Sequence, residues 1–172
     1  SPPPKKKLIG GNLVENLRYG ENPHQGASVY SLNKEINVKQ LNGKKLSYNN
    51  YNDIFTGISL SKSFTKNYST VIIKHANPCG VALDKIKINS YLKAYECDPT
   101  SAFGGIISCN YKVDKTVAKE ISSKFYEVVV ANGFESGALK ILKKKKNLRL
   151  IDSSSLKELN FEQNTSIMNN FL

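Results

Sequence analysis

The stretch VIIKHANPCGVAL, residues 71–83, decides the fold because a buried strand ends there in side chains suited to chemistry. Its apolar start predicts a strand, and Lys74 and His75 follow that strand directly. Consecutive side chains point to opposite faces of a regular strand, so both can enter one cleft only where the chain turns. Asn77-Pro78 followed by Gly80 is typical of a turn, and we therefore predict a turn at these residues.

Elsewhere in the chain, apolar or β-branched runs alternate with helical patterns. Strands are expected over residues 27–31, 69–74, 104–109, 126–131 and 148–151. Helices are expected over residues 50–66, 86–97 and 135–145, and after a capping Asp114. Because connections of this length favour crossovers, the pattern predicts an α/β fold with a mixed, mostly parallel sheet flanked by helices.

Length and composition limit the size of the folded part and the class of protein. A chain of 172 residues, of which 40% are hydrophobic, can bury one respectable core. It has neither an apolar run of about 18 residues nor a charged-then-apolar leader, so we expect a cytoplasmic protein without a membrane segment. Residues 1–12, rich in proline, lysine and glycine, are interpreted as a linker or extension, and residues 13–172 as the folded part.

The net charge of +11 raises the question of nucleic-acid binding. Of the 25 Lys and Arg residues only Arg18 and Arg149 are arginine, whereas readers of bases and phosphates favour the forked guanidinium. The lysine run 143–146 could bind a polyanion, but at the end of an expected helix it also complements the helix dipole. We do not expect nucleic-acid binding. A catalytically silent α/β module that binds nucleotides or polyanions is the alternative to an enzyme.

Lys74 and His75 could act as one catalytic unit. A neighbouring ammonium disfavours the imidazolium and so favours the neutral imidazole that a general base needs. The lysine, in turn, can stabilise an oxyanion. The alternative is a solvent-exposed lysine beside a loop histidine that makes ordinary hydrogen bonds.

A zinc site was considered because His75 and Pro78-Cys79 are partly similar to the signature of hydrolytic deaminases, HxE followed by PCxxC. Asn77 stands where that signature has its glutamate, and the next cysteine along the chain is Cys97. Three ligands cannot be assembled at this spacing, so we expect no metal. With Cys109 the chain has three cysteines, an odd number, and they are widely spaced. This pattern fits reduced thiols better than disulfides.

Three further stretches are rich in polar and turn-forming residues. LRYGENPHQGA (17–27) holds an arginine and a tyrosine, groups suited to a phosphate or carboxylate. LSYNNYND (46–53) places amides at an expected helix start. DPTSAFGGII (98–107) leads through two glycines into a strand, where backbone can approach a ligand closely. Taken singly, each is equally consistent with an ordinary turn.

Together, the stretches LRYGENPHQ, LSYNN..D, IIKHANPCGVA, DPTSAFGGII and ALKILKKKKNLRL occur in an order and spacing that resemble the transformylase part of the AICAR transformylase/IMP cyclohydrolase family. The resemblance covers residues 13–172. It implies formyl transfer from 10-formyltetrahydrofolate to the 5-amino group of aminoimidazole carboxamide ribonucleotide (AICAR), in the synthesis of inosine monophosphate (IMP), without a metal.

The resemblance also implies an architecture and an assembly. The fold would be a cytidine-deaminase-like unit without its metal, forming the N-terminal part of a truncated transformylase domain. The parent protein would be a homodimer and would also carry an IMP cyclohydrolase. This chain would supply one wall of the site and would be inactive alone.

Particular residues receive roles from the same resemblance. Lys74 and His75 would be the catalytic pair, with His75 taking the proton from the attacking amine. The substrate-binding residues would be Arg18 and Tyr19 at or near the nucleotide phosphate, Asn50 as a substrate-contacting amide, Phe103 and Gly104 along the imidazole, Ser101 toward the folate, and Glu127 on the nucleotide. Asn132 departs from the family pattern, in which a proline follows the alanine, so the turn at that point is left open.

Overall fold

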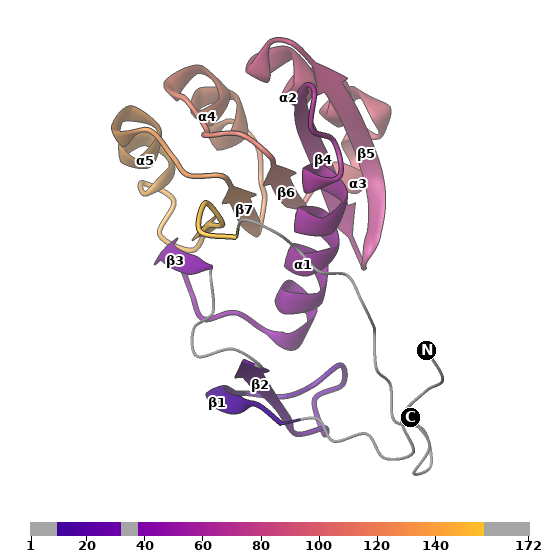
Figure 1. Ribbon diagram of the computed structural model, residues 1–172, viewed down its shortest axis with the longest axis vertical. Helices are drawn as coiled ribbons and strands as arrows, with labels where there is room; N and C mark the ends of the chain where they lie inside the picture. The colour runs from indigo at the N-terminus through magenta and orange to yellow at the C-terminus, as the bar shows by residue number, and fades with distance from the viewer. Residues whose placement is uncertain (1–9, 32–37, 157–172) are drawn as a thin grey trace, which may run out of the picture.

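The computed structural model describes residues 10–31 and 38–156. Within these ranges a two-stranded hairpin lies beside a larger body of helices and sheet (Figure 1). The elements in chain order are β1 (Asn12–Leu17), β2 (Ala27–Ser31), β3 (Lys39–Asn42), α1 (Tyr48–Lys62), β4 (Tyr68–Lys74), β5 (Asn77–Asp84), α2 (Lys87–Cys97), α3 (Pro99–Ala102), β6 (Ile106–Cys109), α4 (Lys115–Ser122), β7 (Val128–Ala131), α5 (Ser136–Leu142) and β8 (Arg149–Asp152).

The larger sheet has the strand order β3-β8-β7-β6-β4-β5. The α/β class and the mixed sheet are confirmed, but the expectation of mostly parallel strands is wrong. Only β6 with β7 and β7 with β8 pair in parallel, whereas β3 with β8, β4 with β5, and β4 with β6 are antiparallel. The reason is the hairpin after β4: the crossover starts from β5, so β4 is inserted between β5 and β6 and runs against both. The likeness to a cytidine-deaminase unit stays a prediction.

Within residues 10–31 and 38–156, α1 is the only helix that packs against one face of the sheet. Ile54 and Ile58 lie one turn apart on α1 and pack against the strands. Gly57 lies between them, where an added Cβ would come 2.9 Å from the Cβ of Ser108, so this helix approaches the sheet closely. The strand residues of this cluster are Val71, Ile73, Ile106, Val128, Val130 and Ile151.

The other face carries the helices α2 to α5 and the larger core cluster. Strand residues of this face, such as Ile72, Ile107 and Val129, alternate along the chain with those of the α1 face, as the two-residue period of a strand requires. Asp114 caps α4 by accepting hydrogen bonds from the N–H groups of Thr116 and Val117, which confirms the expected cap.

The turn between β4 and β5 lies two residues earlier than the sequence indicated. His75 and Ala76 form it with φ angles of 53° and 59°, and Asn77 and Pro78 already belong to β5. Pro78 lacks an N–H, which an edge strand such as β5 tolerates. The turn signal of Asn77-Pro78 was therefore misassigned.

The small hairpin of β1 and β2 is antiparallel and lies near the start of α1 (Figure 1). Tyr51 of α1 donates a hydrogen bond from its hydroxyl to the Glu15 carboxylate of β1, at 3.0 Å. After β7 the chain turns at Asn132, whose N–H donates to the Tyr111 carbonyl, and at Gly133, which has a φ of 95°.

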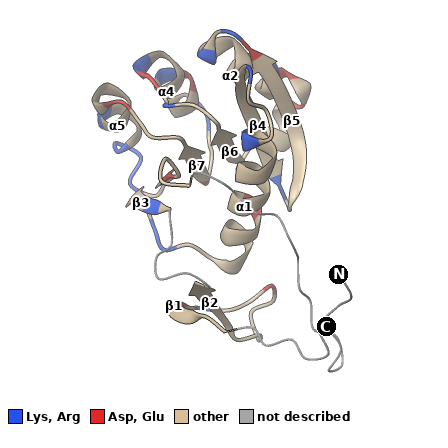
Figure 2. Ribbon diagram, viewed as in Figure 1, with Lys and Arg blue, Asp and Glu red and all other residues tan. Residues whose placement is uncertain are grey.

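Charge is spread over the molecule. Lys and Arg residues occur on the helices of the larger body and on the segments around β3 and do not gather over one element (Figure 2). The run 143–146 follows the end of α5, as expected. Among the described residues, no helix is both long enough and apolar enough to cross a membrane.

Candidate functional site

Two adjoining cavities lie where α1 begins and where several strands start or end. The first, the Lys–His cavity, has a volume of about 500 Å³. The second, the Arg18 hollow, has a volume of about 420 Å³. They share Tyr19, Ser47 and Arg149. The Lys–His cavity is lined by Tyr19, Ser47, Asn49, Asn50, Asp53, Lys74, His75, Phe103, Gly104, Gly105, Ile106, Phe125, Glu127 and Arg149.

The left-handed turn after β4 brings Lys74 and His75 to the same cavity. Lys74 donates a hydrogen bond from Nζ to the carbonyl of Phe103. His75 is exposed at the tip of the hairpin, and its carbonyl accepts a hydrogen bond from Asn77 Nδ2 at 2.9 Å. The pair therefore faces one cleft although its two residues are consecutive.

The start of α1 supplies amide and carboxylate groups. Ser47 and Asn50 form a capping box, in which each side chain accepts a hydrogen bond from the other residue's backbone N–H. Asn50, only 4% exposed, also donates from Nδ2 to Glu127 Oε2 at 3.1 Å. Asp53 follows three residues later and therefore lies on the same side of the helix.

Burial raises the pKa of the Asp53 carboxyl above its ordinary value. The Ala76 N–H, which donates to Asp53 Oδ1 at 2.7 Å, acts in the opposite direction, as does the nearby His75. The charge of Glu127 raises the pKa further. Asp53 thus lies among the charged groups of the cavity.

The glycine loop before β6 forms the opposite wall. Gly104 has a φ of 70°, a conformation that favours glycine, and its N–H donates to the Phe125 carbonyl at 2.9 Å. Phe103 is 64% exposed and its ring packs against that of Phe125, with centroids 5.1 Å apart. This wall therefore offers backbone and aromatic surface to a ligand.

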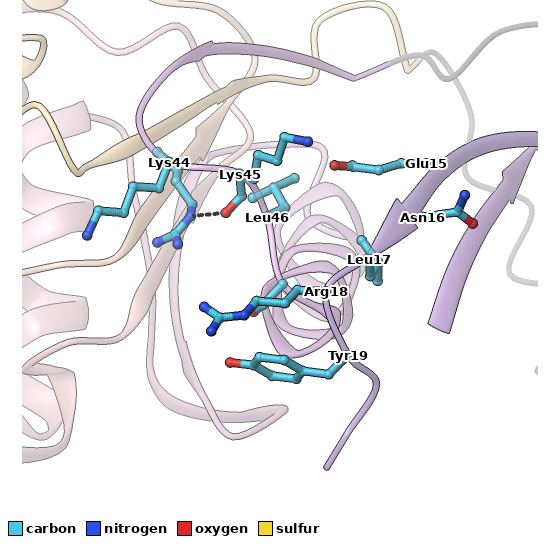
Figure 3. Close-up of a pocket in the computed structure, with 10 residues that line it drawn as sticks. Glu15, Asn16, Leu17, Arg18, Tyr19, Lys44, Lys45 and Leu46 are labelled. Carbon is cyan, nitrogen blue, oxygen red and sulfur yellow. Dashed lines mark hydrogen bonds between the residues drawn. The ribbon is translucent and has the colours of Figure 1, made fainter. Parts of the chain in front are cut away.

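The Arg18 hollow collects cationic groups next to the Lys–His cavity. Arg18 and Tyr19 project side by side from the end of β1 (Figure 3), and the Arg18 guanidinium lies 5.9 Å from the centre of the Tyr19 ring. Arg149 donates from Nε to the Lys45 carbonyl at 3.1 Å and lies 4.0 Å from Glu127 Oε2. Both arginines of the chain thus line one hollow, which suits an anion.

The structure brings most of the expected site residues together. Around the Lys–His cavity lie Lys74, His75, Tyr19, Asn50, Phe103, Gly104 and Glu127. Arg18 lines the adjoining hollow. Ser101 lines neither cavity: it lies on α3, where its N–H and hydroxyl both donate to the Asp98 carboxylate.

Asp53 and Arg149 line the site but were not among the expected residues. Asp53 could have been found from its three-residue spacing to Asn50 on an expected helix. Arg149 could have been found from the scarcity of arginine in a lysine-rich chain.

The cysteines Cys79, Cys97 and Cys109 are all free. Within residues 10–31 and 38–156, no cluster of three or more His, Cys, Asp and Glu side chains is placed to hold a metal ion. The groups that line the two cavities can transfer protons, form hydrogen bonds and stabilise charge.

Fold and site together define an α/β domain with two adjoining open cavities, which are lined by both arginines, a lysine and a histidine. The chain belongs to the AICARFT/IMPCHase bienzyme family, whose model matches residues 2–172. Among similar proteins is the Bifunctional purine biosynthesis protein PurH of Roseobacter denitrificans, 46% identical over 160 residues, which are 90% of this chain and 30% of the relative.

The proteins of the same name from Acetivibrio thermocellus and Clostridium kluyveri are each 49% identical. The matches cover 80% and 88% of this chain, and 28% and 31% of the respective relatives. The chain thus spans less than a third of the length of the curated relatives that it matches.

Proposed function

We propose that this chain is the part of a bifunctional purine biosynthesis enzyme that carries the Lys–His pair and one wall of the nucleotide site for formyl transfer. The parent would transfer the formyl group of 10-formyltetrahydrofolate to the 5-amino group of AICAR, and would also carry the IMP cyclohydrolase. The observation that supports this most is that segments far apart in the sequence, from Tyr19 to Glu127, meet around one cavity with Lys74 and His75.

The reaction needs a base at the amine and a positive group near the formyl oxygen. As the amine nitrogen attacks the formyl carbon, a new C–N bond forms and His75 takes the proton that the amine loses. Lys74 stabilises the negative charge that develops on the formyl oxygen. Breaking the bond between the formyl carbon and folate N10 then completes the transfer, and N10 takes up a proton.

The nucleotide would lie with its phosphate in the Arg18 hollow and its ring toward the glycine loop. Arg18, Tyr19 and Arg149 offer donors to the phosphate. Glu127, hydrogen-bonded to Asn50, offers acceptors to the sugar hydroxyls. The rest of the site, a dimeric assembly and a cytoplasmic location stay proposals that rest on the family.

Steady-state kinetics of the complete bienzyme test this function. His75→Ala should lower turnover by about 10²- to 10⁴-fold with nucleotide affinity nearly unchanged, because a general base acts in the transition state. Arg18→Ala should raise the KM for AICAR more than it lowers turnover, since a phosphate contact stabilises ground and transition states alike.

Lys140→Ala is the matched control for charge, because Lys140 is an exposed residue of α5 that lines neither cavity. Lys140→Ala should leave turnover and the KM for AICAR unchanged. Near-normal turnover of His75→Ala would remove this residue from the mechanism. A loss in Lys140→Ala equal to that in Arg18→Ala would point to unspecific polyanion binding.

A further inference from the structure

Asp53 joins α1 to the turn that carries the Lys–His pair. Its Oδ1 accepts a hydrogen bond from the backbone N–H of Ala76 at 2.7 Å. Ala76 directly follows His75, and both Asp53 and His75 line the Lys–His cavity. The bond therefore fixes the tip of the β4–β5 hairpin against the helix that also carries Asn50.

The turn itself needs support. His75 and Ala76 both have φ angles in the left-handed region, at 53° and 59°. A hairpin turn with two positive φ angles favours Asn-Gly, because side chains with a Cβ are strained there. Each such residue is strained, and the conformation persists only where surrounding contacts hold it.

Besides the strand pairing of Lys74 with Asn77, two side-chain hydrogen bonds hold the turn, and they act differently. Asn77 Nδ2 donates to the His75 carbonyl at 2.9 Å, which is a contact within the hairpin. The Asp53 bond ties the tip of the hairpin to α1, whereas the Lys74 bond to the Phe103 carbonyl ties the end of β4 to the loop before β6. Losing the left-handed turn would let Lys74 and His75 diverge to opposite sides of the strand, as consecutive strand residues do.

We propose that Asp53 is a positioning residue, whose carboxylate holds the His75–Ala76 turn in its left-handed form and thereby directs His75 into the Lys–His cavity. The inference rests on the proposed function for the role of His75, and it adds to that function the residue that places the base. Asp53 acts through the backbone of the turn, without contact to the reacting atoms.

Two variants of the complete bienzyme separate positioning from other roles. Asp53→Ala should lower turnover by about 10- to 100-fold, since displacing a reacting group by about 1 Å can cost about 100-fold. The KM for AICAR should change by less than about threefold, because the phosphate and sugar contacts remain. Asp53→Asn should keep turnover within about threefold of the parent, since its amide oxygen still accepts the Ala76 N–H.

Asp114 provides the matched control. Its carboxylate also accepts backbone hydrogen bonds, at 2.9 and 3.0 Å, but it caps α4 outside both cavities. Asp114→Ala should lower the urea midpoint of unfolding, because α4 loses its cap, and leave turnover per folded enzyme unchanged. A loss of turnover equal to that of Asp53→Ala would overturn the proposal, because general destabilisation would explain both.

The contact can also be measured without activity, by amide hydrogen exchange of this 172-residue chain. Asp53→Ala should speed exchange of the Ala76 amide by at least about tenfold, because the bond that protects it is lost. Asp53→Asn should not. Unchanged exchange in Asp53→Ala would overturn the proposal, as would parental turnover of that variant.

An Asn variant as slow as the Ala variant would also overturn positioning, and would show that the carboxylate charge itself is needed. If His75→Ala kept its turnover while the Ala76 exchange responded as expected, the proposed function would fail and the contact would stand. The two failures are therefore distinguishable.

Discussion

In the part of the chain that the structure describes, α2, α3, α4 and α5 pack on one face of the central sheet, whereas α1 is the one helix that packs on the other. On the first face even polar groups bond to each other in the core, as the hydroxyls of Tyr91 and Tyr126 do at 3.1 Å. On the second, Asn50, Asp53 and Glu127 gather where the single helix begins. The face packed by four helices, here called the filled face, serves stability, whereas on the other, here called the open face, the start of α1 borders both cavities.

The largest effect on stability is expected from the filled face. Ile121 of α4 is 1% exposed, so Ile121→Ala should lower the free energy of unfolding by about 2–5 kcal/mol through lost burial and a cavity. Urea unfolding of the chain measures this. The turnover of the fraction of complete bienzyme that remains folded should be unchanged. A change in turnover would break the separation of the two faces.

The next largest effect is expected from the open face, where a substitution should change the KM for AICAR and leave stability nearly unchanged. Glu127→Gln keeps an acceptor for Asn50 but removes the charge proposed to bind the nucleotide, so the KM for AICAR should rise by about tenfold. Stability should change by less than about 0.5 kcal/mol, because the Glu127 side chain is 48% exposed and its ion pair with Arg149 is long.

Glu135→Gln is the matched control for Glu127→Gln, since Glu135 is exposed at the start of α5 and lines neither cavity. Its KM for AICAR should equal that of the parent. A Glu127→Gln variant that unfolds much more easily but binds normally would reverse the assignment of this residue from binding to stability.

The smallest effect is expected on the pH dependence of stability, and it comes from Tyr126 on the filled face. Burial raises the pKa of Tyr126 from 10.0 to about 12. The unfolded chain therefore loses this proton first, and stability falls as the pH rises from about 10 to about 12. Tyr126→Phe should lose less stability than the parent between pH 9 and pH 11 in urea unfolding. The difference should be below about 1 kcal/mol after allowance for solvent screening; equal losses would contradict it.

Much of the sheet was predictable because its strands are continuous apolar runs. The expected strands at 104–109 and 126–131 contain β6 and β7, and those at 69–74 and 148–151 overlap β4 and β8. The edge strands β3 and β5 were missed. Strand β3 spans only Lys39–Asn42 and is interrupted by a register shift. Strand β5 begins with Asn77 and Pro78, which are commoner in turns.

The lining of the site was predictable where a residue type or a family motif marked it, as with Lys74 and His75, whose roles stay predictions. It was not predictable where tertiary contacts override local preference. The left-handed His75–Ala76 turn carries neither asparagine nor glycine, so its sequence gives no hairpin signal, and the bond from Ala76 to Asp53 crosses between elements. Ser101 shows the converse: its motif indicated a ligand contact, while its polar groups bond to Asp98.

The side chain of Asn50 limits how this domain can be engineered. Its Oδ1 accepts the Ser47 N–H at 3.1 Å while its Nδ2 donates to Glu127 at 3.1 Å. Aspartate would keep the first bond but set two carboxylates against each other, and alanine would lose both bonds. Glutamine is one methylene longer and would have to be accommodated at a position that is 4% exposed. A library randomised at position 50 and selected for both stability and turnover should therefore return asparagine, so the start of α1 has little sequence freedom for thermostabilising design.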